Sequence, residues 1–97
     1  MTERPENLVR VGKKPVMNYV VACVTLFNSG KDEIVLRARG QSINNAVDIV
    51  ERLKKFQKNL DVRDINIGSE DVTRPDGTRA NISTIEISLR KAQPSAD

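Results

Sequence analysis

The 97-residue chain contains no histidine and a single cysteine, Cys23. Zinc sites in proteins are built mainly from cysteine and histidine, and a disulfide needs two cysteines, so the usual zinc sites and an internal disulfide are excluded. The absence of histidine also removes the usual general base of enzyme catalysis. The carboxylates are scattered and no G-x-S-x-G motif is present, so we expect no catalytic residue, no metal, no cofactor and no enzyme activity.

The chain also lacks long apolar runs and has few aromatic residues. No run approaches the roughly 20 residues of a membrane span, and the first ten residues lack the apolar region of a signal peptide. We expect a soluble cytoplasmic protein with no membrane partner. An apolar content of 38% fits one small domain with an aliphatic core, which gains stability if it buries more apolar surface in a dimer. The net charge of +3 does not by itself identify a nucleic acid as partner.

Residues 8–91 are expected to form one domain, between flexible tails at 1–7 and 92–97 that are rich in polar residues and proline. Alternating apolar and polar residues predict strands, and apolar residues at helical spacing predict helices. The expected strands are a short one ending at Gly12, then 33–40, 60–73 and 79–90, and the expected helices are 15–28 and 42–56. The order β-α-β-α-β-β predicts an α/β, two-layer α+β fold with two helices on a four-stranded mixed sheet.

Each predicted helix has an apolar face. Cys23 lies on the first of these faces, which indicates a small core residue and not a nucleophile. On the exposed flank of the second helix, Asp48 with Arg52 and Glu51 with Lys55 have the spacing of i,i+4 ion pairs. The apolar faces are expected to consist of Val16, Tyr19, Val20, Cys23, Val24 and Phe27 in the first helix and of Ile43, Ala46, Val47, Val50, Leu53 and Phe56 in the second.

The last two strands surround the turn 74–77, where Pro75 and Gly77 have the residue types of a tight turn. The outer half of this hairpin has almost nothing to bury and is expected to project as an arm. Arg74 and Arg79 flank its turn. They can act as charges that keep an exposed ribbon from aggregating, or they can enter a nucleic-acid groove, because narrow minor grooves attract arginine.

Lys13 and Lys14 stand directly before Pro15, at the start of the first predicted helix. Positive charge is unfavourable there, because a helix N-terminus carries partial positive charge and unpaired N–H groups. In solvent the cost is only about 0.3–1 kcal/mol, so the lysines can simply be solvated. Alternatively, Gly12 lets the backbone approach a ligand, and the lysines and helix N–H groups bind a phosphate. The pattern G-x-x-x-x-G-K-[ST] is absent, so no nucleoside triphosphate site is implied.

Arg37 and Arg39 lie on one face of the strand 33–40. Because the carboxyl ends of adjacent parallel strands lie together, Gly12 and Gly40 should bring Arg39 near the loop lysines. The alternative is that both arginines pair with acidic neighbours on an exposed sheet face.

The segments "GKKPVMNYV", "ARG", "AVD" and "STIEI" together resemble the Alba family of archaeal chromatin proteins, which bind DNA and RNA. The resemblance spans Leu8 to Lys91. It implies a homodimer whose subunits resemble the C-terminal domain of a bacterial translation initiation factor. It also implies that basic residues of the dimer body contact the backbone of double-stranded DNA while the two arms reach into the minor groove. The matching residues are Lys13, Lys14, Arg39 and nearby Arg37 in the body and Arg74 and Arg79 in the arm.

The same resemblance implies that Lys13 can be acetylated and that neighbouring dimers meet through Phe56, and it allows a heterodimer with a paralogue. Gln41 stands where many relatives have a basic residue, which predicts one phosphate contact fewer per subunit. If Lys13, Lys14 and Arg39 of two subunits neutralise about six phosphates, the slope of log affinity against log salt should be near −5.

The expected function is therefore largely sequence-independent binding of double-stranded DNA by a chromosome-associated protein that also binds RNA. The alternative is an RNA chaperone or a subunit of a ribonuclease P-type particle, because the same basic face can hold either kind of helix. Two further classes stay open at this point. One is an enzyme for phosphorylated small molecules, and the other is a dimerisation module with no nucleic-acid partner.

Overall fold

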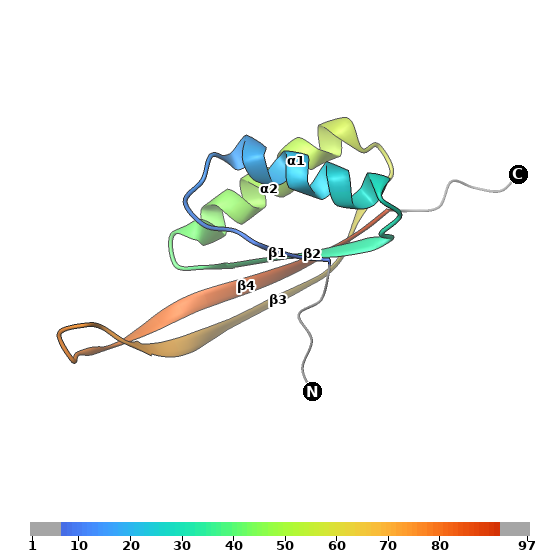
Figure 1. Ribbon diagram of the computed structural model, residues 1–97. Coiled ribbons are helices and arrows are strands. Elements are labelled where there is room, and N and C mark those ends of the chain that lie inside the picture. Colours follow the sequence, from blue (N-terminus) through green and yellow to red (C-terminus); the bar gives the residue numbers. More distant parts are fainter. Residues whose placement is uncertain (1–6, 92–97) are drawn as a thin grey trace, which may run out of the picture.

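The computed structural model describes residues 7–91 and has the predicted order of elements (Figure 1). The predicted tails at 1–6 and 92–97 lie outside the described residues. Asn7, which the prediction assigned to the N-terminal tail, donates a side-chain hydrogen bond of 2.8 Å to the backbone oxygen of Glu33. The elements are β1 (Leu8–Arg10), α1 (Val16–Asn28), β2 (Glu33–Arg39), α2 (Ser42–Phe56), β3 (Leu60–Thr73) and β4 (Arg79–Lys91).

The strands form one mixed sheet in the order β1-β2-β4-β3. β1 is parallel to β2, and β4 is antiparallel to both of its neighbours, β2 and β3. Both helices cover the same face of this sheet, and the opposite face is open (Figure 1). The predicted two-layer α+β fold is therefore confirmed. Neither α1 nor α2 is long and apolar enough to cross a membrane.

The core lies between the helices and the covered face of the sheet. Alternation along β2 turns Ile34, Leu36 and Ala38 inward, as predicted. Burial raises the pKa of the Cys23 thiol to about 12, so this residue is a core side chain and not a nucleophile. The helices contribute Val20, Cys23 and Phe27 from α1 and Ala46, Ile49, Val50 and Leu53 from α2.

The predicted apolar face of α2 is wrong at three positions. Val47 is 44% exposed and Phe56 is 62% exposed, whereas Ile49 is completely buried. The buried positions 46, 49, 50 and 53 follow the spacing i, i+3, i+4, i+7, which turns Val47 towards the side of the helix. On the exposed flank, Glu51 pairs with Lys54 at 3.3 Å and not with Lys55 as predicted.

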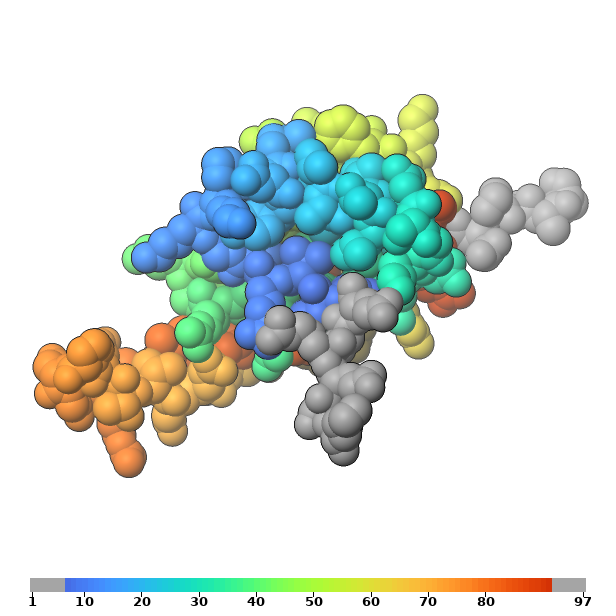
Figure 2. Space-filling model, in the orientation of Figure 1, coloured from blue at the N-terminus to red at the C-terminus, as the bar shows by residue number. Residues whose placement is uncertain are grey.

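The arm consists of residues 69–83. The pairing of β2 with β4 ends at Arg39 and Thr84, while β3 and β4 continue to pair with each other as far as Thr73 and Arg79. As a result the arm projects from the body of the molecule (Figures 1 and 2). None of its side chains is buried. Its turn needs glycine at position 77, where φ is 89°, as the sequence predicted.

Candidate nucleic-acid interface

The basic loop, residues 11–15, joins β1 to α1 and is held by both helices. The backbone N–H groups of Gly12 and Lys14 donate to the hydroxyl oxygen of Tyr19 in α1, at 2.9 and 3.3 Å. The side-chain amide of Asn45 in α2 donates to the backbone oxygen of Gly12 at 3.4 Å. These bonds order the backbone of the loop and leave the two lysine side chains in solvent.

Within the chain, the close neighbour of Gly12 is Tyr19. A Cβ atom added at Gly12 would meet the Tyr19 hydroxyl at 3.4 Å, and the φ angle of Gly12 is not positive. Sequence reasoning placed Tyr19 on an apolar helix face and missed its role in the loop. The signal was its hydroxyl, because a half-buried tyrosine usually hydrogen-bonds its polar end.

The start of α1 carries uncompensated positive charge. Pro15 occupies the N-cap position without a side-chain hydrogen bond, and the first turn has no acidic residue. The side chains of Lys13 and Lys14 are exposed, and neither forms an ion pair within residues 7–91. Two ammonium groups and a helix N-terminus therefore face solvent together, an arrangement that favours an anionic partner.

Arg37 and Arg39 lie on the open face of the sheet, and both form ion pairs. Nε of Arg37 is 3.2 Å from Oε2 of Glu86, and Nη1 of Arg39 is 2.5 Å from Oε1 of Glu70. This is the pairing with acidic neighbours that the sequence left open. All four side chains are well exposed to solvent, so each pair contributes only about 0.2–1 kcal/mol. An anionic ligand can therefore replace these carboxylates at little cost.

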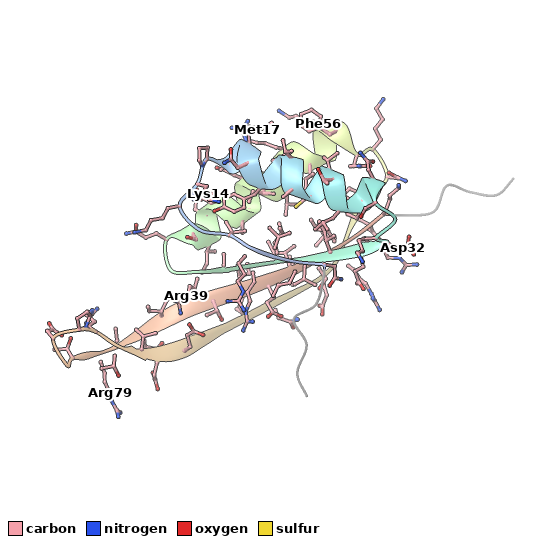
Figure 3. The ribbon with its side chains drawn as sticks, viewed as in Figure 1. Lys14, Met17, Asp32, Arg39, Phe56 and Arg79 are labelled. Atoms are coloured by element: carbon pink, nitrogen blue, oxygen red, sulfur yellow. The ribbon has the colours of Figure 1, made fainter. Side chains whose placement is uncertain are left out.

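The ends of β1 and β2 lie side by side, as their parallel pairing predicted. The backbone N–H of Val11 donates to the oxygen of Arg37 at 2.8 Å, which extends the strand pairing into the basic loop. Lys14 and Arg39 lie at the same end of the molecule, the end from which the arm projects (Figure 3). Lys14 lies beside the start of α1, whereas Arg39 lies beside the sheet.

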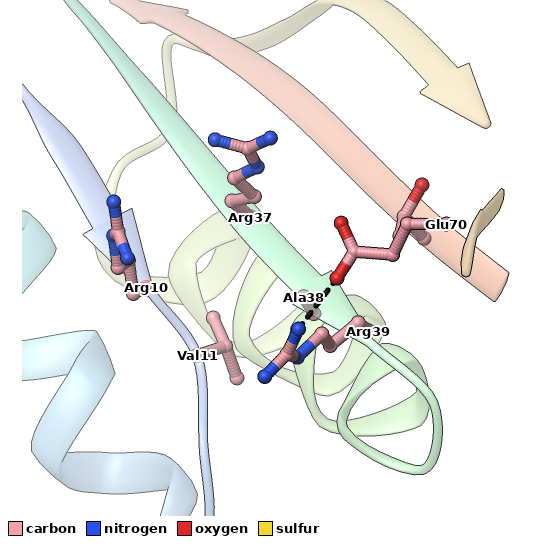
Figure 4. A pocket seen from close by; sticks show the side chains of 7 residues that line it. Arg10, Val11, Arg37, Ala38, Arg39 and Glu70 are labelled. Carbon is pink, nitrogen blue, oxygen red and sulfur yellow. Dashed lines mark hydrogen bonds and ion pairs between the residues drawn. The ribbon is translucent and has the colours of Figure 1, made fainter. Parts of the chain in front are cut away.

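Arg10 belongs to this surface, and sequence reasoning missed it. It is in register with Arg37 on the neighbouring strand, and its side chain is exposed. A hollow of about 350 Å³ opens at this place on the sheet (Figure 4). The available signal was the alternation of Val9, Arg10 and Val11, because the two valines point into the core and turn the arginine away from it. The residues that line the hollow are Arg10, Val11, Arg37, Ala38, Arg39, Glu70 and Thr84.

The arm has two arginines and three carboxylates, so its net charge is −1. Each carboxylate has a partner in the chain: Glu70 pairs with Arg39, Asp71 accepts a bond from Asn81, and Asp76 accepts two from Thr78. The hydroxyl and the backbone N–H of Thr78 hold the pKa of Asp76 below its usual value of 3.8.

The arm arginines differ in their contacts. Arg74 donates to the Thr78 hydroxyl at 3.4 Å, near the limit for a hydrogen bond. Arg79 has no ion pair within residues 7–91, and it extends away from the arm (Figure 3). The two guanidinium groups are therefore available to a ligand, although the arm as a whole is not cationic.

The structure places the remaining predicted site residue, Phe56, apart from these cations. Phe56 ends α2 at a distance from the arm (Figure 3). A separate apolar strip follows the free edge of β3, where Ile65 is 54% exposed and Ile67 is 82% exposed. Among residues 7–91, no three side chains of His, Cys, Asp or Glu are grouped to hold a metal ion.

Comparison with known proteins shows which proteins this chain is similar to. The Alba family profile matches residues 7–69. The chain is 52% identical over 87 residues to DNA/RNA-binding protein Alba 1 of Archaeoglobus fulgidus, which covers 89% of this chain and 97% of that protein. The solved structure of Alba from Thermoplasma volcanium matches with a TM-score of 0.82 and 41% identity, over 87% of this chain and 99% of the other. ALBA1 from Trypanosoma brucei matches with a TM-score of 0.74 and 30% identity, over 94% and 74% of the two chains.

Proposed function

Because the chain belongs to the Alba family, we propose that it is a largely sequence-independent nucleic-acid-binding protein whose main ligand is double-stranded DNA and whose second ligand is RNA. Alba proteins are binding proteins and not enzymes, so the expectation of a non-enzymatic chain is confirmed. A chromosome-associated protein of the cytoplasm fits this function.

The observation that carries the proposal is the basic loop. Tyr19 and Asn45 hold its backbone, while Lys13 and Lys14 have no ion pair within residues 7–91 and stand at an uncapped helix start. A loop that is ordered before binding loses little entropy when it takes up a phosphate. Lysine contacts to phosphates position a protein on a duplex but read no bases, which supports binding without sequence preference.

A homodimer is the second part of the proposal. β3 is an edge strand of the sheet, and Ile65 and Ile67 point to the helix-covered side without being buried, since their partners in β4 are Ile87 and Ile85. Exposed apolar edges favour association between chains. A two-fold dimer that covers these isoleucines and the exposed Val47 of α2 would carry two basic loops and two arms.

We place the two arms in the minor groove. Arg74 and Arg79 flank the tip of each arm, and narrow minor grooves attract arginine. Because the net charge of the arm is −1, its contribution comes from these individual guanidinium groups and not from general attraction.

Three finer points belong to the same proposal. Lys13 is exposed and therefore accessible to an acetyltransferase, and acetylation would remove one charge per subunit. Phe56, 62% exposed, is a contact point between neighbouring dimers, and a paralogue with a matching β3 edge could form a heterodimer.

The RNA chaperone or ribonuclease P-type role is the second candidate, because the Archaeoglobus relative is named for both DNA and RNA. Competition between a duplex and a structured RNA of equal length decides which ligand is preferred.

The proposal is tested by titrating a random-sequence duplex at several salt concentrations with the parent protein and the Lys13→Ala/Lys14→Ala variant. If Lys13, Lys14 and Arg39 act twice per dimer, the parent slope is about −5.4 and the variant slope about −1.8, at about 0.9 per phosphate. The matched control is Lys55→Ala/Lys58→Ala, which removes the same charge in the last turn of α2 and just beyond it, and which should keep the parent slope. A slope near zero for the parent would contradict the proposal, and so would an equal reduction of the slope in the two double variants.

A further inference from the structure

The hollow on the open face of the sheet contains more arginines than carboxylates (Figure 4). Glu86 pairs with Arg37 and Glu70 pairs with Arg39, whereas Arg10 forms no ion pair within residues 7–91. The three arginines and the two glutamates that pair with them therefore leave one positive charge, that of Arg10, without a partner within residues 7–91.

The position of Arg10 is unfavourable for the isolated fold. Arg10 and Arg37 are register partners on adjacent parallel strands, so both side chains leave the sheet on the same face. Like charges directly opposite each other destabilise a sheet. In the described structure Glu86 compensates only the Arg37 side of this pair. An anion that binds beside Arg10 would complete the compensation.

We propose that this hollow is a further binding site for the nucleic-acid backbone, in which Arg10 and Arg39 bind two neighbouring phosphates and Glu70 competes with the second phosphate for Arg39. The inference rests on the proposed function and adds two residues to it, one cation that strengthens binding and one carboxylate that weakens it. Guanidinium groups suit this role because their fork of N–H donors matches phosphate oxygens, and the Thr84 hydroxyl lines the same hollow as a further donor.

The location of the hollow favours a polymer phosphate over a small free anion. Arg39 lies at the end of the molecule that carries the basic loop and the arm, and the hollow opens directly on the sheet surface (Figures 3 and 4). A backbone that contacts Lys13 and Lys14 can continue across this surface towards the arm. The hollow would then be one of several contacts along a single strand.

Glu70 also connects this site to the arm. It lies in β3, opposite Ile82 of β4. Ile82 is two residues past Thr84, the last residue of β4 that pairs with β2. Its bond to Arg39 therefore crosses β4 and ties the base of the arm to the end of β2. A phosphate that replaces the Glu70 carboxylate on Arg39 removes this tie at the same moment.

The experiment uses the full chain and a random-sequence duplex, with salt titrations of the parent, Arg10→Gln and Glu70→Gln. Each variant has a control with the same change of charge away from the hollow. Arg90→Gln, near the C-terminal end of β4, is the control for Arg10→Gln, and Glu51→Gln, on α2, is the control for Glu70→Gln. Arg10→Gln should weaken binding and reduce the steepness of the slope by about 1.8 per dimer, so that the affinity lost between about 50 and 200 mM salt falls by about tenfold. Glu70→Gln should strengthen binding at every salt concentration. Thermal unfolding of all variants checks that they are folded.

Each outcome decides the matter. If Arg10→Gln behaves like Arg90→Gln, or if Glu70→Gln binds no better than Glu51→Gln, the hollow is not a phosphate site and the inference is overturned. If the parent protein still binds duplex DNA and loses affinity in the Lys13→Ala/Lys14→Ala variant, the proposed function stands even though the inference fails. A parent protein that binds no nucleic acid at all would overturn both.

Discussion

The Tyr19→Phe substitution separates the order of the basic loop from its charge. It removes one oxygen atom, the acceptor for the backbone N–H groups of Gly12 and Lys14 at 2.9 and 3.3 Å. The Gly12 bond is partly buried, so its N–H loses a partner that water replaces incompletely, whereas the Lys14 N–H is exposed and can bond to water. A net contribution of about 1 kcal/mol follows for the pair. For a domain of this size that corresponds to a fall in Tm of about 4–8 °C.

The effect on binding should have a distinct form. All lysines and arginines are kept, so the slope of log affinity against log salt should equal that of the parent. The affinity itself should fall at every salt concentration, by about fivefold if about 1 kcal/mol of loop order must be regained on binding. Fluorescence anisotropy with a labelled duplex over a range of salt concentrations measures both quantities.

Thr25→Val is the matched control, because it removes a hydroxyl from the exposed part of the same helix, and it should change neither the slope nor the affinity. A change of slope in Tyr19→Phe would mean that the hydroxyl influences which cations reach the phosphates. An unchanged affinity despite a lower Tm would mean that the lysines bind equally well from a disordered loop. Either result would refute the argument that the loop is ordered in advance for its ligand.

If the proposed dimer forms through the edge of β3, Ile67→Lys should yield monomers in sedimentation velocity, while Asn66→Lys, on the other face of β3, should sediment like the parent; a dimeric Ile67→Lys would exclude this edge as the interface. Leu53→Ala should cost about 2–5 kcal/mol in urea unfolding, because Leu53 is completely buried, and a cost below about 1 kcal/mol would contradict the described core. The lowered pKa of Asp76 means that its bonds to Thr78 stabilise the arm turn above pH 3.8 and are lost as pH falls through the lower, folded-state pKa. NMR titration of Asp76 in the parent and in Thr78→Val measures this, and equal pKa values in the two proteins would contradict the cause.

The parts of the fold that could be predicted from the sequence depend on local patterns. Period-two alternation identified β2, and the sequence Pro75-Asp76-Gly77 located the turn that divides residues 60–90 into β3 and β4. The apolar face of α2 was harder, because both Val47 and Ile49 lie at helical spacing from Val50 or Leu53. Only packing against the sheet decides which of them is buried.

The site could be predicted less completely, for physical reasons. The exposure of Lys13 and Lys14 follows from residue type, since lysine is rarely buried. The pair between Arg39 and Glu70 joins residues 31 positions apart and crosses an intervening strand, so it depends on a register that no local pattern contains. Arg10 lies in a strand of three residues, which is too short for its alternation to be distinctive.

These contacts change the meaning of the salt dependence that the sequence predicted. A slope near −5 assumes that Arg39 is free, yet in the described structure Arg39 is bound to Glu70. If Glu70 stays bound to Arg39, the four loop lysines of the proposed dimer give a slope of about −3.6. If a phosphate replaces the Glu70 carboxylate on Arg39 in both subunits, the slope steepens to about −5.4, and if Arg10 also binds a phosphate in both subunits, it steepens to about −7.2. The exchange is favourable because the pair is exposed and therefore weak, and because a phosphate can accept two parallel hydrogen bonds from the guanidinium group, whereas Glu70 accepts one from Arg39 in the described structure. The part of the measured slope beyond about −3.6 therefore counts the arginines that contact phosphates.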